Sequence, residues 1–242
     1  MPPIVHCVRH AQGVHNLSHA NHNLPDPELT PLGEEQAREL GAKFHSLENI
    51  ELIVSSPLQR TIQTALLAFA SQVRDGGLQV VAWPEVQEAS DLVCDTGSDL
   101  RDIEQKFNQS PVDFSLVTPG WHIKQGKWAP IAERLLERAQ LAREWLMQRP
   151  EKEIVVVSHG CFLHLLTDDW VNAINSHATD WTNAEVRSYH FEHYENKKPA
   201  LCETLQSRER RSLGPASPSR KEQLELKKTT LETWIKWGVI SA

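Results

Sequence analysis

Three short stretches of the chain are mostly apolar and rich in β-branched residues. They cover residues 4–8, 51–55 and 153–157, and the last of them reads EIVVV. Unbroken runs of this length are typical of parallel strands that are buried on both faces. We therefore expect the three stretches to be central, parallel strands of one sheet.

Longer stretches with helical apolar spacing lie between and before these runs. They cover residues 31–44, 57–69 and 130–148, where apolar side chains recur every three or four positions. Strands that alternate with helices predict an α/β fold, specifically a three-layer α/β/α sandwich around a mostly parallel sheet.

The starts of two predicted helices are marked by capping residues. Thr30 before Pro31 predicts an N-cap followed by proline at the first helical position. Residues 56–59 (SPLQ) read as a capping box directly after the second apolar run. This start places Arg60 within one turn of a helix N-terminus, at the carboxyl end of a strand.

Basic side chains follow all three predicted strands. Arg9 and His10 follow the first, Arg60 follows the second, and His159 with Gly160 follows the third. The carboxyl ends of neighbouring parallel strands share one edge of the sheet, where helix N-termini bind anions. Guanidinium groups neutralise phosphoryl oxygens, and a neutral imidazole can attack phosphorus. The pattern predicts phosphoryl transfer.

Four motifs resemble, in order, those of the histidine phosphatase superfamily, the phosphoglycerate mutase-like group with the RHG motif. Ala11 replaces the usual glycine of that motif, and we expect it to keep a negative φ. The overall arrangement is most similar to phosphatases of fungal and plant type, and it implies a phosphoglycerate mutase-like fold. The matches span residue 4 to about residue 192 and read VRHA with Asn16, LTPLGEEQA, SSPLQRTIQTA and VSHG.

The resemblance also implies roles for individual residues. His10 would be the nucleophile that becomes phosphorylated, and it would need a neutral ring whose other nitrogen donates to a backbone carbonyl. The catalytic set would be His10, Glu88, His159, Arg9 and Arg60, and the phosphate-binding set Arg9, Asn16, Arg60, His159 and Gly160.

The general acid of this family is a carboxylate in a segment that residues 84–88 (PEVQE) match. Glu88 is the expected acid and Glu85 the alternative. The acid would protonate the leaving alkoxide and then activate water against the phosphohistidine.

Residues 111–130 are loop-like and carry two of the eight tryptophans. In related phosphatases, an insertion in this region covers the active site. We therefore predict a lid in which Trp121 and Trp128 form an apolar wall, while Lys124 and Lys127 offer a second anion contact.

Charge is distributed unevenly along the chain. From residue 196 onward there are ten Lys or Arg against five Glu, about +5, so residues 1–195 carry −12 of the total of −7. An acidic body argues against nucleic acid as a partner. No apolar run approaches the roughly 18 residues of a membrane span, and the first residues do not resemble a secretory signal. We expect a cytoplasmic protein without a membrane partner.

Metal and disulfide sites are not predicted. The four cysteines form no CxxC pair, which is typical of reduced, partly buried thiols. His15, His19 and His22 have spacing like that of metal ligands, but no Cys or acidic pair accompanies them. We expect them in a solvated or hydrogen-bonded loop.

The domain prediction is a catalytic domain over residues 1–195 and a basic tail over residues 196–242. Within the tail, residues 207–221 read as a linker. Residues 222–237 have a helical pattern, which predicts a helix that packs on the core and docks Trp234 and Trp237.

These observations favour a phosphatase that requires no metal or other cofactor and hydrolyses a phosphomonoester or diphosphate of a small metabolite through a phosphohistidine at His10. A phosphoglycerate-type phosphomutase is one alternative, although residues 23–28 lack the GWxD-like segment of those enzymes. A catalytically idle phosphate-binding scaffold is the other. The identity of the substrate and the oligomeric state stay open.

Overall fold

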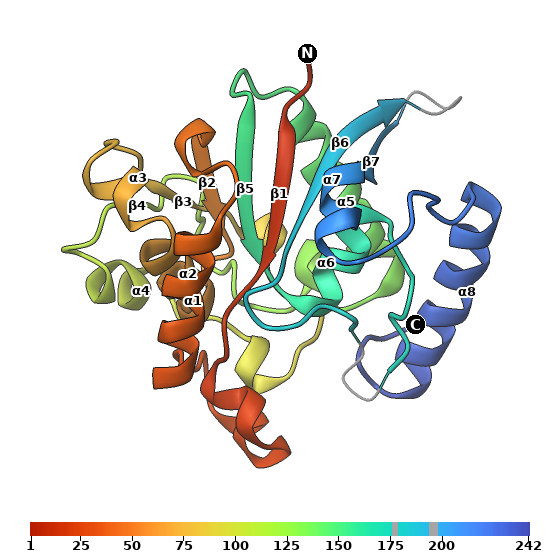
Figure 1. Cartoon of the computed structure of the whole chain (residues 1–242). Coiled ribbons are helices and arrows are strands. Elements are labelled where there is room, and N and C mark those ends of the chain that lie inside the picture. The colour runs from red at the N-terminus through yellow and green to blue at the C-terminus, as the bar shows by residue number, and fades with distance from the viewer. Residues whose placement is uncertain (176–178, 194–197) are drawn as a thin grey trace.

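A seven-stranded sheet forms the centre of the molecule (Figure 1). The computed structural model describes residues 1–175, 179–193 and 198–242. The sheet has the order β4-β3-β2-β5-β1-β6-β7. Its strands are β1 (Ile4–Arg9), β2 (Leu52–Ser55), β3 (Val80–Ala82), β4 (Val112–Asp113), β5 (Glu153–Ser158), β6 (Val186–His193) and β7 (Pro199–Glu203).

Strands β1 to β5 are parallel, whereas β6 pairs antiparallel with β1 and β7 pairs antiparallel with β6. The three apolar runs of the sequence are β1, β2 and β5, which confirms the prediction of adjacent central strands. In the register, Arg9 pairs with Ser158 and Ser55 pairs with Val157. The carboxyl ends of these strands therefore meet at one edge.

Helices cover both faces of the sheet, which confirms the three-layer α/β prediction (Figure 1). The helices are α1 (Pro31–Lys43), α2 (Gln59–Ala68), α3 (Ala70–Arg74), α4 (Leu100–Lys106), α5 (Ala132–Met147), α6 (Gly160–Thr167), α7 (Leu205–Arg210) and α8 (Arg220–Lys236). Residues of α1 and α2 pack with Val8 and Val155 on one face. Residues of α5 and α6 pack with Val5 and Val156 on the other.

Six 3₁₀-helical turns complete the described secondary structure: η1 (Val14–Leu17), η2 (His19–Asn23), η3 (Leu47–Asn49), η4 (Pro84–Val86), η5 (Val93–Asp95) and η6 (Gly126–Trp128). Among the described residues, no helix is both long enough and apolar enough to cross a bilayer.

Helix α1 begins as predicted, but α2 does not. The Thr30 hydroxyl accepts a hydrogen bond from the N–H of Gly33 at 3.0 Å, as expected of an N-cap. Helix α2 instead begins at Gln59, without a side-chain cap from its own N-cap residue. The carboxylate of Asp26, from a distant loop, accepts the N–H of Gln59 at 2.9 Å. The capping-box prediction at Ser56 is therefore wrong.

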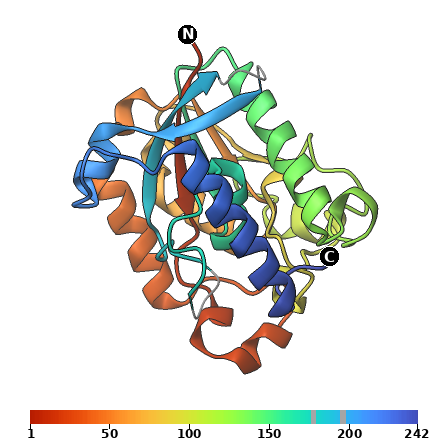
Figure 2. The ribbon, with the colours of Figure 1, turned by 90° about the vertical axis from the view of Figure 1, so that its right-hand side faces the viewer.

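The C-terminal part of the chain contains more structure than a linker and one helix. Helix α7 begins at Leu205, two residues before the predicted linker, and ends at Arg210. Residues 207–210 are therefore helical, and the linker prediction is wrong for them. Helix α8 starts from a capping box between Ser219 and Glu222. It lies on the same side of the sheet as α5 and α6 (Figure 2).

Only one of the two tail tryptophans is docked. The side chain of Trp234 is fully buried, with its ring centroid 5.8 Å from that of Trp170. The side chain of Trp237 is 49% exposed, which corrects the expectation that both would pack on the core.

Candidate active site

The side chains that follow β1, β2 and β5 meet at the carboxyl edge of the sheet. The rings of His10 and His159 lie 5.2 Å apart between centroids. Arg60, in the first turn of α2, reaches the ring of His159. The strand order explains this convergence, because β5 lies between β1 and β2.

His10 is held as a neutral imidazole. Its Nδ1 lies 2.7 Å from the carbonyl oxygen of Ala11, so Nδ1 carries the proton and donates it, as the sequence predicted. Burial lowers the pKa of His10 well below its usual range, and the nearby Arg60 adds to this effect. Nε2 is then the unprotonated nitrogen, which is the form that a nucleophile requires.

Ala11 fits the turn after His10 without strain. Its φ is not positive, and its side chain is fully buried. Its N–H donates to the hydroxyl of Thr64 at 3.1 Å. Alanine at this position therefore meets the conformational requirement of the turn after His10.

His159 is fixed by one donor and one acceptor. Its Nδ1 lies 3.2 Å from an Nη of Arg60, which only donates, so Nδ1 is the acceptor. Nε2 then carries the proton and donates to the hydroxyl of Ser56 at 2.8 Å. This contact engages the hydroxyl that the sequence pattern assigned to capping α2. Burial, reinforced by Arg60, lowers the pKa of His159 well below its usual range.

Gly160 begins α6 directly after this histidine. A Cβ at this position would lie 2.6 Å from the side chain of Thr179, which is too close for any other residue. Gly160 therefore lets the N-terminus of α6 approach this neighbouring segment.

Arg60 is completely buried and is held by the turn η5. Its Nη1 donates to the carbonyl oxygen of Cys94, and its Nη2 donates to a carboxylate oxygen of Asp95, both at 2.7 Å. The other carboxylate oxygen of Asp95 accepts from the hydroxyl of Ser90 at 2.6 Å. Sequence reasoning missed Asp95, because it lies 35 positions from Arg60 in a stretch without apolar periodicity.

Arg9 ends β1 and is partly buried at the same edge. One of its Nη atoms donates to the carbonyl oxygen of Trp181, and its buried Nε has no hydrogen-bond partner among the described residues. Burial lowers the pKa of Arg9, whereas the charge of Glu88 counteracts the shift. Arg9 and Glu88 are therefore electrostatic neighbours.

Asn16 is exposed. Its side-chain oxygen accepts the N–H of Gly13 at 3.0 Å and an amide N–H of Asn183 at 3.3 Å. In this conformation its oxygen shapes the loop after β1. Its predicted contact with phosphate stays a prediction.

Glu88 lies at the N-terminus of α6. One carboxylate oxygen accepts from the N–H groups of Ala89 at 2.8 Å and Phe162 at 2.9 Å. Burial raises the pKa of Glu88 above its usual value, and the negative charge of Asp95 adds to the rise. Glu85, the alternative acid, instead forms an ion pair with Lys127 at 3.3 Å. The geometry therefore favours Glu88 as the carboxyl group of the site.

His15 is part of the site, contrary to the solvated or hydrogen-bonded loop expected for it. Its ring is buried and lies 5.3 Å from that of His10. Burial lowers the pKa of His15 to about 2, with a further contribution from Arg60. No sequence signal separates His15 from the exposed His19, since burial of the loop depends on tertiary contacts.

His15, His19 and His22, whose spacing is like that of metal ligands, do not form a group of ligands among the residues that the structure describes. The potential three-ligand group there is His190, Glu192 and Cys202, on β6 and β7. The four cysteines form no disulfide with one another.

Residues 111–130 pack against the acid segment. The ring of Trp121 is fully buried in a cluster with Leu58. Trp128 is also buried, and the ammonium of Lys127 lies 4.0 Å from its ring centroid. The ammonium of Lys124 donates to the carbonyl oxygen of Glu88 at 3.1 Å. Their function as a lid stays a prediction.

Two basic side chains donate hydrogen bonds to the carbonyl oxygen of Glu88. Besides Lys124, Arg138 of α5 donates to this oxygen at 3.3 Å and is itself buried. Burial lowers the pKa of Lys124 to about 7, and the charge of Arg138 adds to this shift. The sequence did not identify Arg138 as a neighbour of Glu88, because the helical pattern of α5 places Arg138 on that helix but does not show which residues it contacts.

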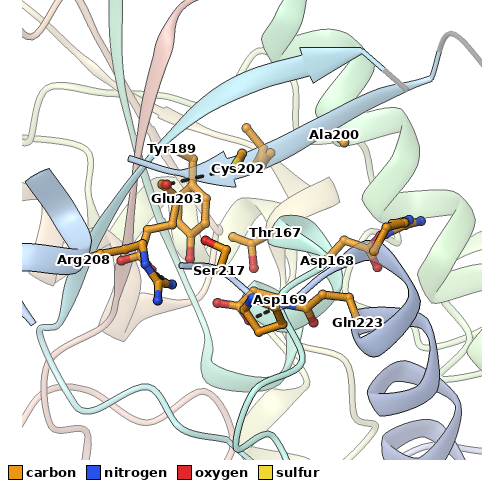
Figure 3. A pocket seen from close by; sticks show the side chains of 13 residues that line it. Thr167, Asp168, Asp169, Tyr189, Ala200, Cys202, Glu203, Arg208, Ser217 and Gln223 are labelled. Carbon is orange, nitrogen blue, oxygen red and sulfur yellow. Dashed lines mark hydrogen bonds and ion pairs between the residues drawn. The ribbon is translucent and has the colours of Figure 1, made fainter. Parts of the chain in front are cut away.

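A separate cavity lies between β7, the end of α6 and the start of α8 (Figure 3). Its lining includes Asp168, Tyr189, Glu203 and Gln223 and none of the predicted site residues. The candidate active site is therefore identified by its chemistry and not by this cavity.

The fold and this edge of basic side chains define an α/β protein in which two histidines and two arginines meet at the carboxyl edge of the sheet. The defining sequence pattern of the Histidine phosphatase superfamily (branch 1) matches residues 5–204. The chain belongs to this superfamily.

Curated relatives from plants and fission yeast are similar over most of the chain. A phosphoglycerate mutase-like protein of Arabidopsis thaliana is 27% identical over 237 residues, which cover 76% of this chain and 82% of the relative. Phosphoglycerate mutase-like protein 1 of the same plant is 31% identical over 195 residues, covering 66% and 68%. A probable phosphatase of Schizosaccharomyces pombe is 28% identical over 166 residues, covering 66% and 76%.

Solved structures support the fold assignment. The ecdysone phosphate phosphatase from Bombix mori in complex with tungstate has a TM-score of 0.57 at 14% identity, covering 90% of this chain and 94% of that one. A phosphoserine phosphatase mutant from Entamoeba histolytica in complex with phosphoserine has a TM-score of 0.51 at 21% identity, covering 82% and 94%. At these identities the similarity concerns the fold alone.

Proposed function

We propose that this protein is a metal-independent phosphatase that hydrolyses a phosphomonoester or diphosphate of a small metabolite through a phosphohistidine at His10. The observation that carries the proposal is the state of His10. Its ring is neutral, Nδ1 is engaged by the Ala11 carbonyl at 2.7 Å, and Nε2 is left as the nucleophile beside Arg60 and His159.

In the first step, Nε2 of His10 forms a bond to phosphorus as the bond from phosphorus to the leaving oxygen breaks. The guanidinium groups of Arg9 and Arg60 neutralise the phosphoryl oxygens. The Nε2–H of His159, which donates to the Ser56 hydroxyl in this structure, exchanges that partner for a phosphoryl oxygen when the substrate binds. Glu88 gives its proton to the leaving oxygen, which departs as an alcohol.

In the second step, the Glu88 carboxylate accepts a proton from water as the water oxygen bonds to phosphorus. The bond between phosphorus and Nε2 breaks, inorganic phosphate leaves, and both His10 and Glu88 return to their starting protonation states. Burial raises the pKa of Glu88, which favours the protonated form that the first step requires.

Relatives and neighbours support a small phosphorylated substrate. Solved neighbours include the complex of a phosphoserine phosphatase with phosphoserine and one with 3-phosphoglyceric acid. A relative in fission yeast is described as a probable phosphatase. We extend this class of substrate to the present chain.

The test is hydrolysis of p-nitrophenyl phosphate in the presence of EDTA by wild type, His10→Ala and the control His19→Ala, which changes an exposed histidine. We expect turnover in wild type and in His19→Ala and its loss in His10→Ala. Wild type incubated with a ³²P-labelled phosphomonoester should carry an acid-labile, alkali-stable label, as a phosphohistidine does. Retention of most activity in His10→Ala would refute the scheme.

The same assays separate the alternatives. A scaffold would bind inorganic phosphate but hydrolyse no phosphomonoester. A mutase would return the label from the protein to a phosphorylated product in preference to water.

A further inference from the structure

The catalytic edge contains a buried carboxylate that the proposed mechanism does not use. Asp95 belongs to η5, and the distance from its Oδ1 to an Nη of Arg60 is 2.7 Å. Its side chain is 11% exposed, and that of Arg60 is 1% exposed. A carboxylate beside an arginine that should bind a phosphoryl group competes with that group for the cation, so its presence requires an explanation.

Both oxygens of Asp95 are engaged. Oδ1 accepts from Arg60, and Oδ2 accepts from the hydroxyl of Ser90 at 2.6 Å. The N–H of Leu92 in turn donates to the Ser90 oxygen at 3.2 Å. These contacts fix the carboxylate within its own loop, so that it acts as a rigid support.

The support extends through Arg60 to His159. The same Nη2 that contacts Asp95 also donates to Nδ1 of His159 at 3.2 Å. The Cys94 carbonyl oxygen holds Nη1 at 2.7 Å, so two acceptors of η5 fix the plane of the guanidinium. The position of Arg60 in turn determines which nitrogen of His159 carries the proton.

The loop that carries Asp95 also carries the candidate acid. Glu88 precedes Ser90 by two residues, and the two carboxylates interact electrostatically. The loop therefore connects the proton donor to the arginine over a stretch of eight residues, 88–95.

We propose that Asp95 is a positioning residue of the phosphatase: held by Ser90, it fixes the guanidinium of Arg60 against Nδ1 of His159. The inference rests on the proposed function, because it assigns Asp95 to the phosphoryl-transfer step. Asp95 acts through Arg60 and does not touch the phosphoryl group. It keeps the arginine in the geometry of the transition state at the expense of some affinity for the phosphate anion.

This role predicts that turnover falls in a variant of Asp95 while anion binding does not weaken. In Asp95→Asn, the side-chain oxygen still accepts from Arg60, but one negative charge leaves the phosphate pocket. We expect kcat to fall about 10- to 100-fold, because the guanidinium is held less firmly. The affinity for inorganic phosphate should stay the same or increase, because the cation has lost its competitor.

The experiment measures kcat with p-nitrophenyl phosphate and the dissociation constant of inorganic phosphate by isothermal titration calorimetry. It compares wild type with Asp95→Asn, Asp95→Glu and Ser90→Ala. Asp95→Glu keeps the charge and should recover part of the lost kcat. Ser90→Ala frees one carboxylate oxygen and should lower kcat less than Asp95→Asn. The control is Glu203→Gln, a buried carboxylate outside the site that pairs with Arg211 at 2.9 Å, and its kcat should match wild type.

Two results would overturn the proposal: a kcat of Asp95→Asn equal to wild type, or phosphate affinity that falls together with kcat. Circular dichroism and thermal unfolding confirm that each variant is folded, and Ser90→Ala provides the test if Asp95→Asn is not. Phosphate binding does not require turnover. A failure of the proposed function, seen as absent hydrolysis in wild type, is therefore distinguishable from a failure of this inference.

Discussion

The contact between Gly33 and the loop after His10 gives a sharp test of how the site is held. Gly33 lies in the first turn of α1, against the backbone of Gln12. A Cβ at residue 33 would lie 2.1 Å from the carbonyl oxygen and 2.9 Å from the carbonyl carbon of Gln12. A carbon and an oxygen need about 3.3 Å, so Gly33→Ala requires the helix and the loop to separate by roughly 1 Å.

The structure indicates the cost of this separation. The carbonyl oxygen of Gln12 accepts from the N–H of Thr30 at 2.9 Å. The backbone N–H of Gln12 donates to the side-chain oxygen of Gln36, also at 2.9 Å. Overpacking costs about 1–3 kcal/mol, and weakening one such hydrogen bond adds about 1 kcal/mol. Alanine in a helix recovers about 1 kcal/mol. The net loss in the free energy of unfolding is about 1–3 kcal/mol.

The same displacement should impair catalysis. A shift of about 1 Å in the loop next to His10 lowers kcat/KM by roughly 10- to 100-fold. Urea unfolding and hydrolysis of p-nitrophenyl phosphate measure the two effects. Gly214→Ala is the matched control, because a Cβ there meets nothing within 4 Å, and it should be neutral or stabilising by up to about 1 kcal/mol. If Gly33→Ala unfolds at the same urea concentration as wild type and keeps its kcat/KM, α1 does not hold the catalytic loop.

Three further predictions concern the acid, the predicted lid and the tail. Glu88→Gln should lower kcat by about 10²–10⁴-fold, and a pH–rate profile should lose the limb on which activity falls as pH rises through the raised pKa of Glu88. Burial lowers the pKa of Lys124 to about 7, so this side chain is cationic below pH 7 and neutral above it. KM should therefore increase as the pH is raised through 7 in wild type but not in Lys124→Ala. The double variant Lys124→Ala/Trp121→Ala should have a higher KM than wild type at similar kcat. Trp234→Ala should destabilise the protein by about 3–5 kcal/mol in urea, whereas Trp237→Ala, at a side chain 49% exposed, should change stability by less than about 0.5 kcal/mol.

Each of these predictions has a specific contrary result. Glu85→Gln is the control for the acid, and an equal loss of kcat in both glutamate variants would remove the distinction between them. A KM that is independent of pH across several substrates would show that Lys124 does not contact an anion. Equal destabilisation by the two tryptophan variants would contradict the packing of α8.

The sequence predicted the elements whose signals are local. Strands β1, β2 and β5 are mostly apolar because the central strands are buried on both faces, and Thr30 with Pro31 marks the start of α1. Strands β6 and β7 were not predicted, because they lie at one side of the sheet and carry mixed polar and apolar residues. Their positions depend on pairing with distant strands.

The residues of the candidate site also fall into those with a local sequence signal and those placed by tertiary contacts. His10 and Arg60 follow strands and stand in motifs, so the sequence identified both. Asp95 and His15 lie in short turns, and only tertiary contacts bring them to the site. The predicted cap at Ser56 was wrong for a related reason, because its hydroxyl hydrogen-bonds to a histidine 103 positions away.

The central place of β5 has a consequence for how the chain folds. Both strands that flank β5 precede it by about a hundred residues or more, since Ile4 pairs with Glu153 and Leu52 pairs with Ile154. During synthesis, β1 and β2 therefore emerge with facing edges that lack their native partner, and unpaired edges are templates for pairing with other chains. The sheet closes only when β5 enters between them, and such long-range pairing folds slowly. The same insertion brings His10 and His159 together, so the proposed phosphatase activity would report that β5 has entered the sheet.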